Sequence, residues 1–147
     1  DPIRVICDSR ARTPIDSRIV QTANKIPTYI AVVGRNERTA ELERHGVHIL
    51  ECKTKNERVD LADLMRQLGA LGIDGLLLEG GSALAFSALE AGVVHRVQAY
   101  IAPKIIGMQV TSFSGSACTI LSNPRPPTGL FAPAPPMDED FLIEGRL

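Results

Sequence analysis

The sequence contains no tryptophan, and aromatic residues make up only 4% of its 147 residues. It also lacks any run near the roughly 20 apolar residues that span a bilayer, so we expect no membrane partner. Basic residues are not in excess, because 16 lysines and arginines face 17 aspartates and glutamates, a formal net charge of −1. Strong nucleic-acid binders usually carry a basic surplus, which argues against a nucleic-acid partner.

Cysteine is scarce and widely spaced, at Cys7, Cys52 and Cys118. No CxxC or mixed Cys/His ligand pattern is present, so we expect three free thiols in a reducing cytoplasm, no disulfide framework and no metal site. The three histidines do not have a recognised ligand spacing either, and we interpret them as ordinary surface or loop residues: His45, His48 and His95. Without a G-x-S-x-G elbow, a serine-hydrolase function has no support.

The sequence does contain 44% hydrophobic and 22% charged residues, values typical of a globular domain. Short, β-branched apolar runs alternate with helix-forming stretches. The expected strands cover residues 3–7, 29–33, 47–50, 75–78 and 97–102, and the expected helices cover residues 37–45, 61–71 and 82–91. This order predicts an α/β fold with a mainly parallel sheet.

Local signals support several of these boundaries. Asp60 is a good N-cap, and Leu61, Leu64, Met65 and Leu68 after it fall on one helical face. Glycines 46, 72 and 92 mark helix ends. The run from 29 to 33 is continuous and apolar, which predicts a strand buried on both faces.

The last third of the chain differs in composition. Six of the ten prolines lie in residues 124–136, which favours a long surface loop over a helix or central strand. Residues 141–147 then predict a final strand, antiparallel and at a sheet edge.

The most informative segment is residues 76–86, where an apolar strand, two glycines and a helix follow one another. Unpaired N–H groups and the dipole at a helix N-terminus favour an anion, and glycines let a phosphate approach the backbone. Ser82 could cap this helix or donate to a phosphate, and Glu79 lies at a strand end where α/β proteins bind ligands. The pattern is neither GxGxxG nor a P-loop, so a plain tight turn remains an alternative.

A second polar corner follows the first expected strand, at Asp8-Ser9-Arg10. Ser9 is short enough to hydrogen-bond a phosphate or ribose. Arg10 and Arg12 could pair with a phosphate in a bidentate manner. A solvated loop with surface salt bridges is the competing interpretation.

Four motifs in order resemble the reductase domain of the bifunctional deaminase/reductase of riboflavin synthesis. They are IRVICDSRARTP (residues 3–14), LEGGSAL (78–84), AGVV with YIAPKIIG (91–94 and 100–107), and the terminal EGRL (144–147). The resemblance implies a three-layer α/β/α, dihydrofolate-reductase-like fold with an antiparallel C-terminal edge strand. It also implies NADPH-dependent reduction of the ribosyl side chain of 5-amino-6-(5-phosphoribosylamino)uracil to a ribityl chain.

The same resemblance assigns roles to individual residues. Ser9 and the stretch Gly81, Ser82, Ala83, Leu84, Ala85, Phe86 and Ser87 would hold NADPH, and Glu79 would contact the substrate. No residue is assigned as the proton donor, because hydride transfer is the chemistry of the cofactor. Arg10 and Arg12 are candidates for contact with the 2′-phosphate.

Residues 1–147 resemble one incomplete reductase domain that lacks its N-terminal elements and any deaminase domain, and so need not be active alone. The resemblance further implies a cytoplasmic homodimer, and a zinc deaminase domain fused to it in the full-length protein. Two alternatives stay open: a reductase of the same fold acting on another pterin-like or nucleotide substrate, and a non-catalytic nucleotide-binding domain.

Overall fold

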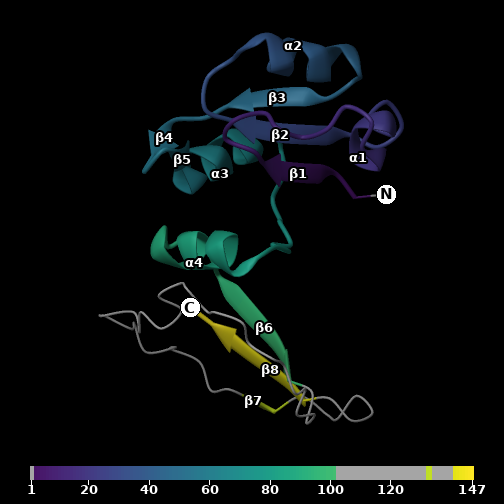
Figure 1. The fold of residues 1–147 in the computed structure, drawn as a ribbon. Coiled ribbons are helices and arrows are strands. Elements are labelled where there is room, and N and C mark those ends of the chain that lie inside the picture. Colours follow the sequence, from purple (N-terminus) through teal and green to yellow (C-terminus); the bar gives the residue numbers. More distant parts are fainter. Residues whose placement is uncertain (1, 102–131, 134–140) are drawn as a thin grey trace, which may run out of the picture. The chain divides into compact units, whose positions relative to one another are not determined.

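The structure is a computed structural model, and it describes residues 2–101, 132–133 and 141–147 (Figure 1). The chain divides into two compact units, Asp1–Val93 and Val94–Leu147, which are described separately below. Whether the whole chain is a single domain stays a prediction.

The first unit contains a three-stranded parallel sheet in the order β1-β2-β3 (Figure 1). Strand β1 covers Arg4–Cys7, β2 covers Thr28–Val32 and β3 covers His48–Glu51. Both pairings are parallel. The strands expected at residues 3–7, 29–33 and 47–50 and their parallel arrangement are therefore confirmed.

Four helices belong to this unit. They are α1 (Arg18–Gln21), α2 (Glu37–Arg44), α3 (Leu61–Ala70) and α4 (Ser82–Glu90). Asp60 caps α3 as expected, because its carboxylate accepts hydrogen bonds from the N–H groups of Ala62 and Asp63. The short α1 was not predicted, since four residues carry too little periodicity to be recognised.

A small antiparallel hairpin connects β3 to α3. It consists of β4 (Thr54–Lys55) and β5 (Arg58–Val59), with Thr54 opposite Val59 and Lys55 opposite Arg58. Its two turn residues, Asn56 and Glu57, both have positive φ, which is the backbone of a type I′ turn. This hairpin was also not predicted.

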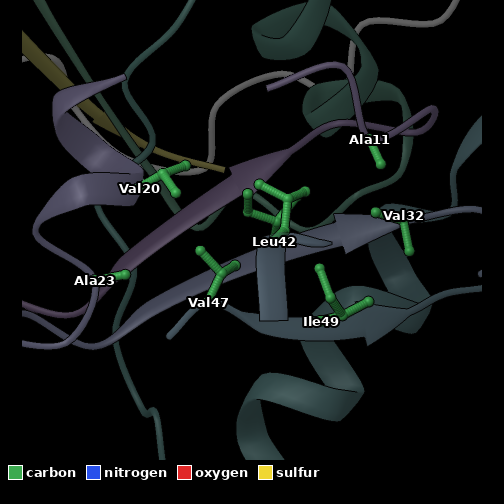
Figure 2. Packing of buried hydrophobic residues seen from close by; sticks show 8 residues of the cluster. Ala11, Val20, Ala23, Val32, Leu42, Val47 and Ile49 are labelled. Atoms are coloured by element: carbon green, nitrogen blue, oxygen red, sulfur yellow. The ribbon is translucent and has the colours of Figure 1, made fainter. Parts of the chain in front are cut away.

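Strand β2 lies at the centre of the core. Its residues Ile30, Ala31 and Val32 are all 0% exposed, so both faces of the strand are buried, as the apolar run predicted. One face belongs to a cluster in which Leu42 of α2 and Val20 of α1 pack with strand residues (Figure 2). The full cluster of buried residues is Ala11, Val20, Ala23, Ile30, Val32, Leu42, Val47 and Ile49.

The expected strand at residues 75–78 is not formed. This segment has no regular secondary structure, and Leu77 is 78% exposed, with Leu76 and Leu78 also exposed. A strand requires a neighbour for its backbone N–H and C=O groups, and no described strand pairs with this segment. The prediction of a strand from this apolar run was therefore wrong for this structure.

The second unit contains an antiparallel sheet in the order β6-β8-β7. Strand β6 covers Arg96–Ile101, β7 covers Ala132–Pro133 and β8 covers Phe141–Arg146. The antiparallel direction of the last strand is confirmed, but its edge position is wrong, because β8 pairs on both sides. Pro133 lies in the edge strand β7, where a missing N–H is tolerated. The rest of the proline-rich stretch lies outside the described residues.

The described residues therefore form one parallel and two antiparallel sheets rather than a single, mainly parallel one. No helix in this part of the chain is both long enough and apolar enough to cross a membrane.

Candidate functional site

The N-terminus of α4 is open to solvent. Gly81 is the N-cap residue, no side chain caps the helix, and its first turn contains no acidic residue. Helix geometry gives the N–H groups of Ser82 and Ala83 no acceptor within the helix, so they can donate to a ligand. A Cβ atom built at Gly81 would meet no heavy atom within 4 Å, which leaves room for close approach to the backbone.

The seven residues from Gly81 to Ser87 form the cap and the first six positions of α4. Gly81, Ser82 and Ala83 are exposed, whereas Leu84, Ala85 and Ser87 are partly buried and Phe86 is 37% exposed. Glu79 precedes them as an exposed residue. It follows the segment that forms no strand here, so the position expected for it, at the carboxyl end of a parallel strand, is not formed in this structure.

The second polar corner is a loop held by Asp8 at the end of β1. The Asp8 carboxylate accepts hydrogen bonds from the backbone N–H and the hydroxyl of Thr13, both at 2.7 Å. Ala11, in the middle of the loop, is 1% exposed and has a positive φ of 52°. The loop is therefore anchored at its start, centre and end.

Charge on Asp8 is favoured by this loop. Burial by itself would raise the pKa of Asp8, but hydrogen bonds from the Thr13 hydroxyl and from the backbone N–H groups of Arg12, Thr13 and Arg10 lower it overall. The carboxylate thus stays ionised as an internal acceptor.

Ser9 has a structural contact that the sequence did not reveal. Its hydroxyl oxygen accepts a hydrogen bond of 3.1 Å from the N–H of Val59, which lies 50 residues away in the hairpin. The carbonyl of Ser9 accepts another from the N–H of Val33. A hydroxyl that accepts one bond can still donate its own proton, so Ser9 can also donate to a ligand oxygen.

Arg10 and Arg12 are both exposed, and neither forms an ion pair with the residues that the structure describes. No hydrogen bond within those residues joins Ser9 to the stretch from Glu79 to Ser87. The two polar corners lie in the same unit, but no hydrogen bond or ion pair among the described residues joins them.

Thiol and metal chemistry find no support in this part of the molecule. Burial, followed by the nearby carboxylate of Asp63, raises the pKa of Cys52 to about 11, and burial also raises the pKa of Cys7. Both thiols are free and remain protonated near neutral pH. Cys118 lies outside the described residues. Within residues 2–101, 132–133 and 141–147, no group of three potential ligands could hold a metal ion.

Residues 1–122 match the family model described as the RibD C-terminal domain. The chain belongs to this family. The expected resemblance to the reductase domain of riboflavin biosynthesis is therefore confirmed.

Named relatives of this RibD C-terminal domain agree with the match. It is 54% identical over 107 residues to the riboflavin biosynthesis protein RibD of Actinobacillus pleuropneumoniae, over 72% of this chain and 28% of the relative. It is 41% identical over 109 residues to the 2,5-diamino-6-ribosylamino-4(3H)-pyrimidinone 5′-phosphate reductase of Methanothermobacter thermautotrophicus, over 73% of this chain and 48% of the relative. The matched region thus spans between about a quarter and a half of these relatives.

A solved structure supports the fold of the RibD C-terminal domain. Acinetobacter baumannii RibD superposes with a TM-score of 0.70 at 23% identity, covering 99% of this chain and 37% of that chain. At this identity the likeness concerns the fold alone.

Proposed function

We propose that this chain is the cofactor-binding part of an NADPH-dependent reductase of riboflavin biosynthesis. The reaction would reduce the ribosyl side chain of 5-amino-6-(5-phosphoribosylamino)uracil to a ribityl chain. The family match and the reductase names of its relatives support this reaction class. The observation that carries the proposal is the uncapped, glycine-led N-terminus of α4.

A dinucleotide phosphate fits the residues present at this helix. Free N–H groups at Ser82 and Ala83, together with the helix dipole, favour an anionic oxygen, and the open space at Gly81 admits it. The proposed cofactor set is Ser9 with Gly81, Ser82, Ala83, Leu84, Ala85, Phe86 and Ser87. The free guanidinium groups of Arg10 and Arg12 are candidates for the 2′-phosphate that distinguishes NADPH from NADH.

When bound, NADPH would supply a hydride to the C1 carbon of the opened ribose. The protein would mainly bind and orient the two reactants, which is where most of the rate acceleration in such a reaction arises. Glu79, exposed and next to the glycines, would accept hydrogen bonds from the substrate. No described side chain is assigned as the proton donor.

The helix site can be tested with two matched glycine variants. Gly81→Ala and Gly69→Ala both add a methyl group where no heavy atom lies within 4 Å, and neither glycine has a positive φ. We expect Gly81→Ala to weaken NADPH binding about tenfold or more, because the methyl group would occupy the space of the phosphate. Gly69→Ala, within α3, should leave binding unchanged. Calorimetric titration with NADPH and NADH measures both.

If Gly81→Ala binds NADPH as tightly as the unaltered chain does, the phosphate does not lie at α4 and the assignment is wrong. Turnover is a separate question, best measured in a protein that also contains the reductase segment preceding this region in the relatives. Tight NADPH binding without turnover of the aminouracil ribotide there would favour the non-catalytic alternative. Turnover of another pterin-like substrate would favour the same-fold alternative.

The extent of the domain is part of the proposal. We propose that the complete reductase has a three-layer, dihydrofolate-reductase-like architecture, and that elements preceding Asp1 complete it. The exposed leucines at residues 76–78 support this, because an apolar run beside a ligand site is usually covered. A fused zinc deaminase, a homodimer and a cytoplasmic location remain predictions from the family resemblance.

A further inference from the structure

The first unit contains a small cavity that none of the residues assigned so far explains. It has a volume of about 80 Å³ and lies between the hairpin, the start of α3 and the second half of α4. Its polar lining includes Lys55, Asn56 and Arg58 of the hairpin and Ser87 and Glu90 of α4. A cavity of this size holds a few waters or one tetrahedral anion, and it is too small for a whole nucleotide.

Two positive charges lie side by side at this cavity. Lys55 and Arg58 are opposite each other in the hairpin register, so their side chains share one face. Neither forms an ion pair with a described residue. Like charges in directly opposite positions repel each other, and an anion between them would remove that repulsion.

The cavity also contains two carboxylates. That of Asp60 accepts hydrogen bonds from the N–H groups of Ala62 and Asp63 and so caps α3. That of Glu90 lies at the other end of the lining and forms no ion pair with a described residue. The lining therefore contains two cations and two carboxylates, and of these only the carboxylate of Asp60 is already hydrogen-bonded to the start of α3.

Neutral hydrogen-bond donors complete the site. The amide of Asn56 and the hydroxyl of Ser87 form no side-chain hydrogen bond with described residues, so both can donate to a ligand. A phosphate oxygen is the acceptor that a lysine, an arginine, an amide and a hydroxyl together suit best.

The position of the hairpin connects this cavity to the proposed cofactor site. Val59, which lines the cavity, donates its N–H to the hydroxyl of Ser9. Ser87, on the opposite wall, is the last residue of the stretch that begins at Gly81. The cavity is thus lined by one residue of the α4 stretch and by the residue that is hydrogen-bonded to Ser9.

We propose that Lys55 and Arg58 bind a phosphate monoester of a ligand of this reductase. The inference rests on the proposed function, since two ligands of that reaction, NADPH with its 2′-phosphate and the substrate with its ribose 5-phosphate, both carry this group. The hairpin is then a phosphate-recognition element in addition to the N-terminus of α4.

The test compares two double variants of the 147-residue chain. Lys55→Gln with Arg58→Gln removes both cavity cations. Arg18→Gln with Lys25→Gln removes two exposed cations near α1, before β2, and serves as the matched control. A third variant, Lys55→Arg with Arg58→Lys, exchanges the cations and keeps their charge. Calorimetry measures the binding of NADPH, NADH and ribose 5-phosphate, and circular dichroism checks folding.

We expect the cavity variant to bind a phosphate monoester about tenfold more weakly or worse, and the control and exchange variants to bind normally. Loss of NADPH affinity with unchanged NADH affinity would support recognition of the 2′-phosphate. Loss of ribose 5-phosphate affinity alone would support recognition of the substrate phosphate.

The remaining outcomes contradict one proposal or the other. Equal losses for NADPH and NADH, or no loss for any ligand, would overturn the hairpin site even if NADPH binds well to the unaltered chain. If the unaltered chain binds neither dinucleotide but binds ribose 5-phosphate through Lys55 and Arg58, the cofactor assignment fails and the hairpin site stands. A folded unaltered chain that binds none of the three ligands would overturn both.

Discussion

At the scale of single residues, Ser9 shows how one hydroxyl can connect distant parts of the chain. Its oxygen accepts the N–H of Val59, a residue that is 6% exposed. Replacing Ser9 with Ala would leave that buried N–H without its acceptor, at a cost of about 1–3 kcal/mol. If the Ser9→Ala variant lost NADPH binding, the loss could come either from this structural damage or from a missing contact with the ligand. The comparison of Gly81→Ala with Gly69→Ala is therefore the cleaner test.

Asp63 is the buried carboxylate that joins α3 to the chain after β3. Its oxygens accept hydrogen bonds from the N–H of Lys53 at 2.9 Å, from the amide of Gln67 at 3.0 Å and from Arg66 at 2.6 Å. The bond from Lys53 is the main cause of a lowered Asp63 pKa, with Gln67 and Arg66 adding to it against an opposing effect of burial. The folded state thus prefers the ionised carboxylate.

A group whose pKa is lower in the folded state stabilises the protein above its unfolded pKa, and this stability is lost as the pH falls through the folded value. We therefore expect Asp63→Asn to lower the free energy of unfolding at pH 7. The difference from the unaltered chain should shrink below about pH 4, near the ordinary pKa of aspartate. Urea unfolding at a series of pH values measures this.

Asp16→Asn is the control, because Asp16 is an exposed carboxylate that forms no ion pair with a described residue. Its effect on stability should be small at every pH. A constant difference between Asp63→Asn and the unaltered chain from pH 7 to pH 3 would show that the charge of Asp63 is not what stabilises the fold.

At the scale of elements, the hairpin turn has an unfavourable residue. Asn56 and Glu57 have φ values of 51° and 60°, in the left-handed region that asparagine and glycine tolerate and other residues adopt at a cost of about 1–2 kcal/mol. A type I′ turn prefers Asn-Gly at these two positions. We expect Glu57→Gly to raise the free energy of unfolding by about 0.5–1 kcal/mol, part of the gain being offset by the flexibility of glycine in the unfolded chain.

The matched variant is Asn56→Gly, at the neighbouring turn position. Asparagine already tolerates this conformation, so that change should alter stability little or reduce it. Urea denaturation of the three proteins gives the comparison. If the Glu57→Gly protein is no more stable than the Asn56→Gly protein, the result would argue against a type I′ turn at residues 56 and 57.

The sequence predicted the first unit well where the signals were strong. Strands β1 and β2 are rich in β-branched residues and β3 contains a short apolar run, and α2 to α4 carry caps, glycine stops or a clear apolar face. The hairpin was missed because Asn56-Glu57 lacks the Asn-Gly signal that marks such turns. The strand predicted at residues 75–78 is absent for a different reason. An apolar run forms a strand only when another strand pairs with its backbone, and no described strand pairs with this segment.

The candidate site was predictable only in part, for a similar reason. The anion-binding character of α4 follows from local sequence, because two glycines and a helix start are contiguous. The contact between Ser9 and Val59 spans 50 residues, and the cavity combines side chains from a hairpin and two helices. Such arrangements depend on tertiary packing, which motif spacing does not encode.

At the scale of the whole molecule, an apolar segment lies exposed beside the proposed ligand site. The three leucines at residues 76–78 are exposed, while Leu64 of α3 is only 1% exposed. The matched region covers 28% of the Actinobacillus pleuropneumoniae relative and 48% of the Methanothermobacter thermautotrophicus one, so both relatives contain further chain. The proposal that elements preceding Asp1 complete the reductase domain therefore predicts that these elements cover Leu77.

Leu77→Ser tests this in two forms of the protein: the 147-residue chain, and the same chain extended at its start by the preceding reductase segment of the Actinobacillus pleuropneumoniae relative. In the shorter form an exposed leucine contributes little, and we expect a loss of stability below about 0.5 kcal/mol. In the extended form a buried leucine contributes about 1.5–3 kcal/mol, and the loss should be of that size. Urea unfolding measures both.

Leu64→Ala is the internal reference for this comparison. Because Leu64 is already buried in the short chain, we expect a cost of about 2–5 kcal/mol in both forms. If Leu77→Ser is as harmless in the extended protein as in the short one, while Leu64→Ala destabilises both, the exposed segment is not covered by the preceding elements. The apolar surface at residues 76–78 would then require a different explanation, such as contact with a second chain.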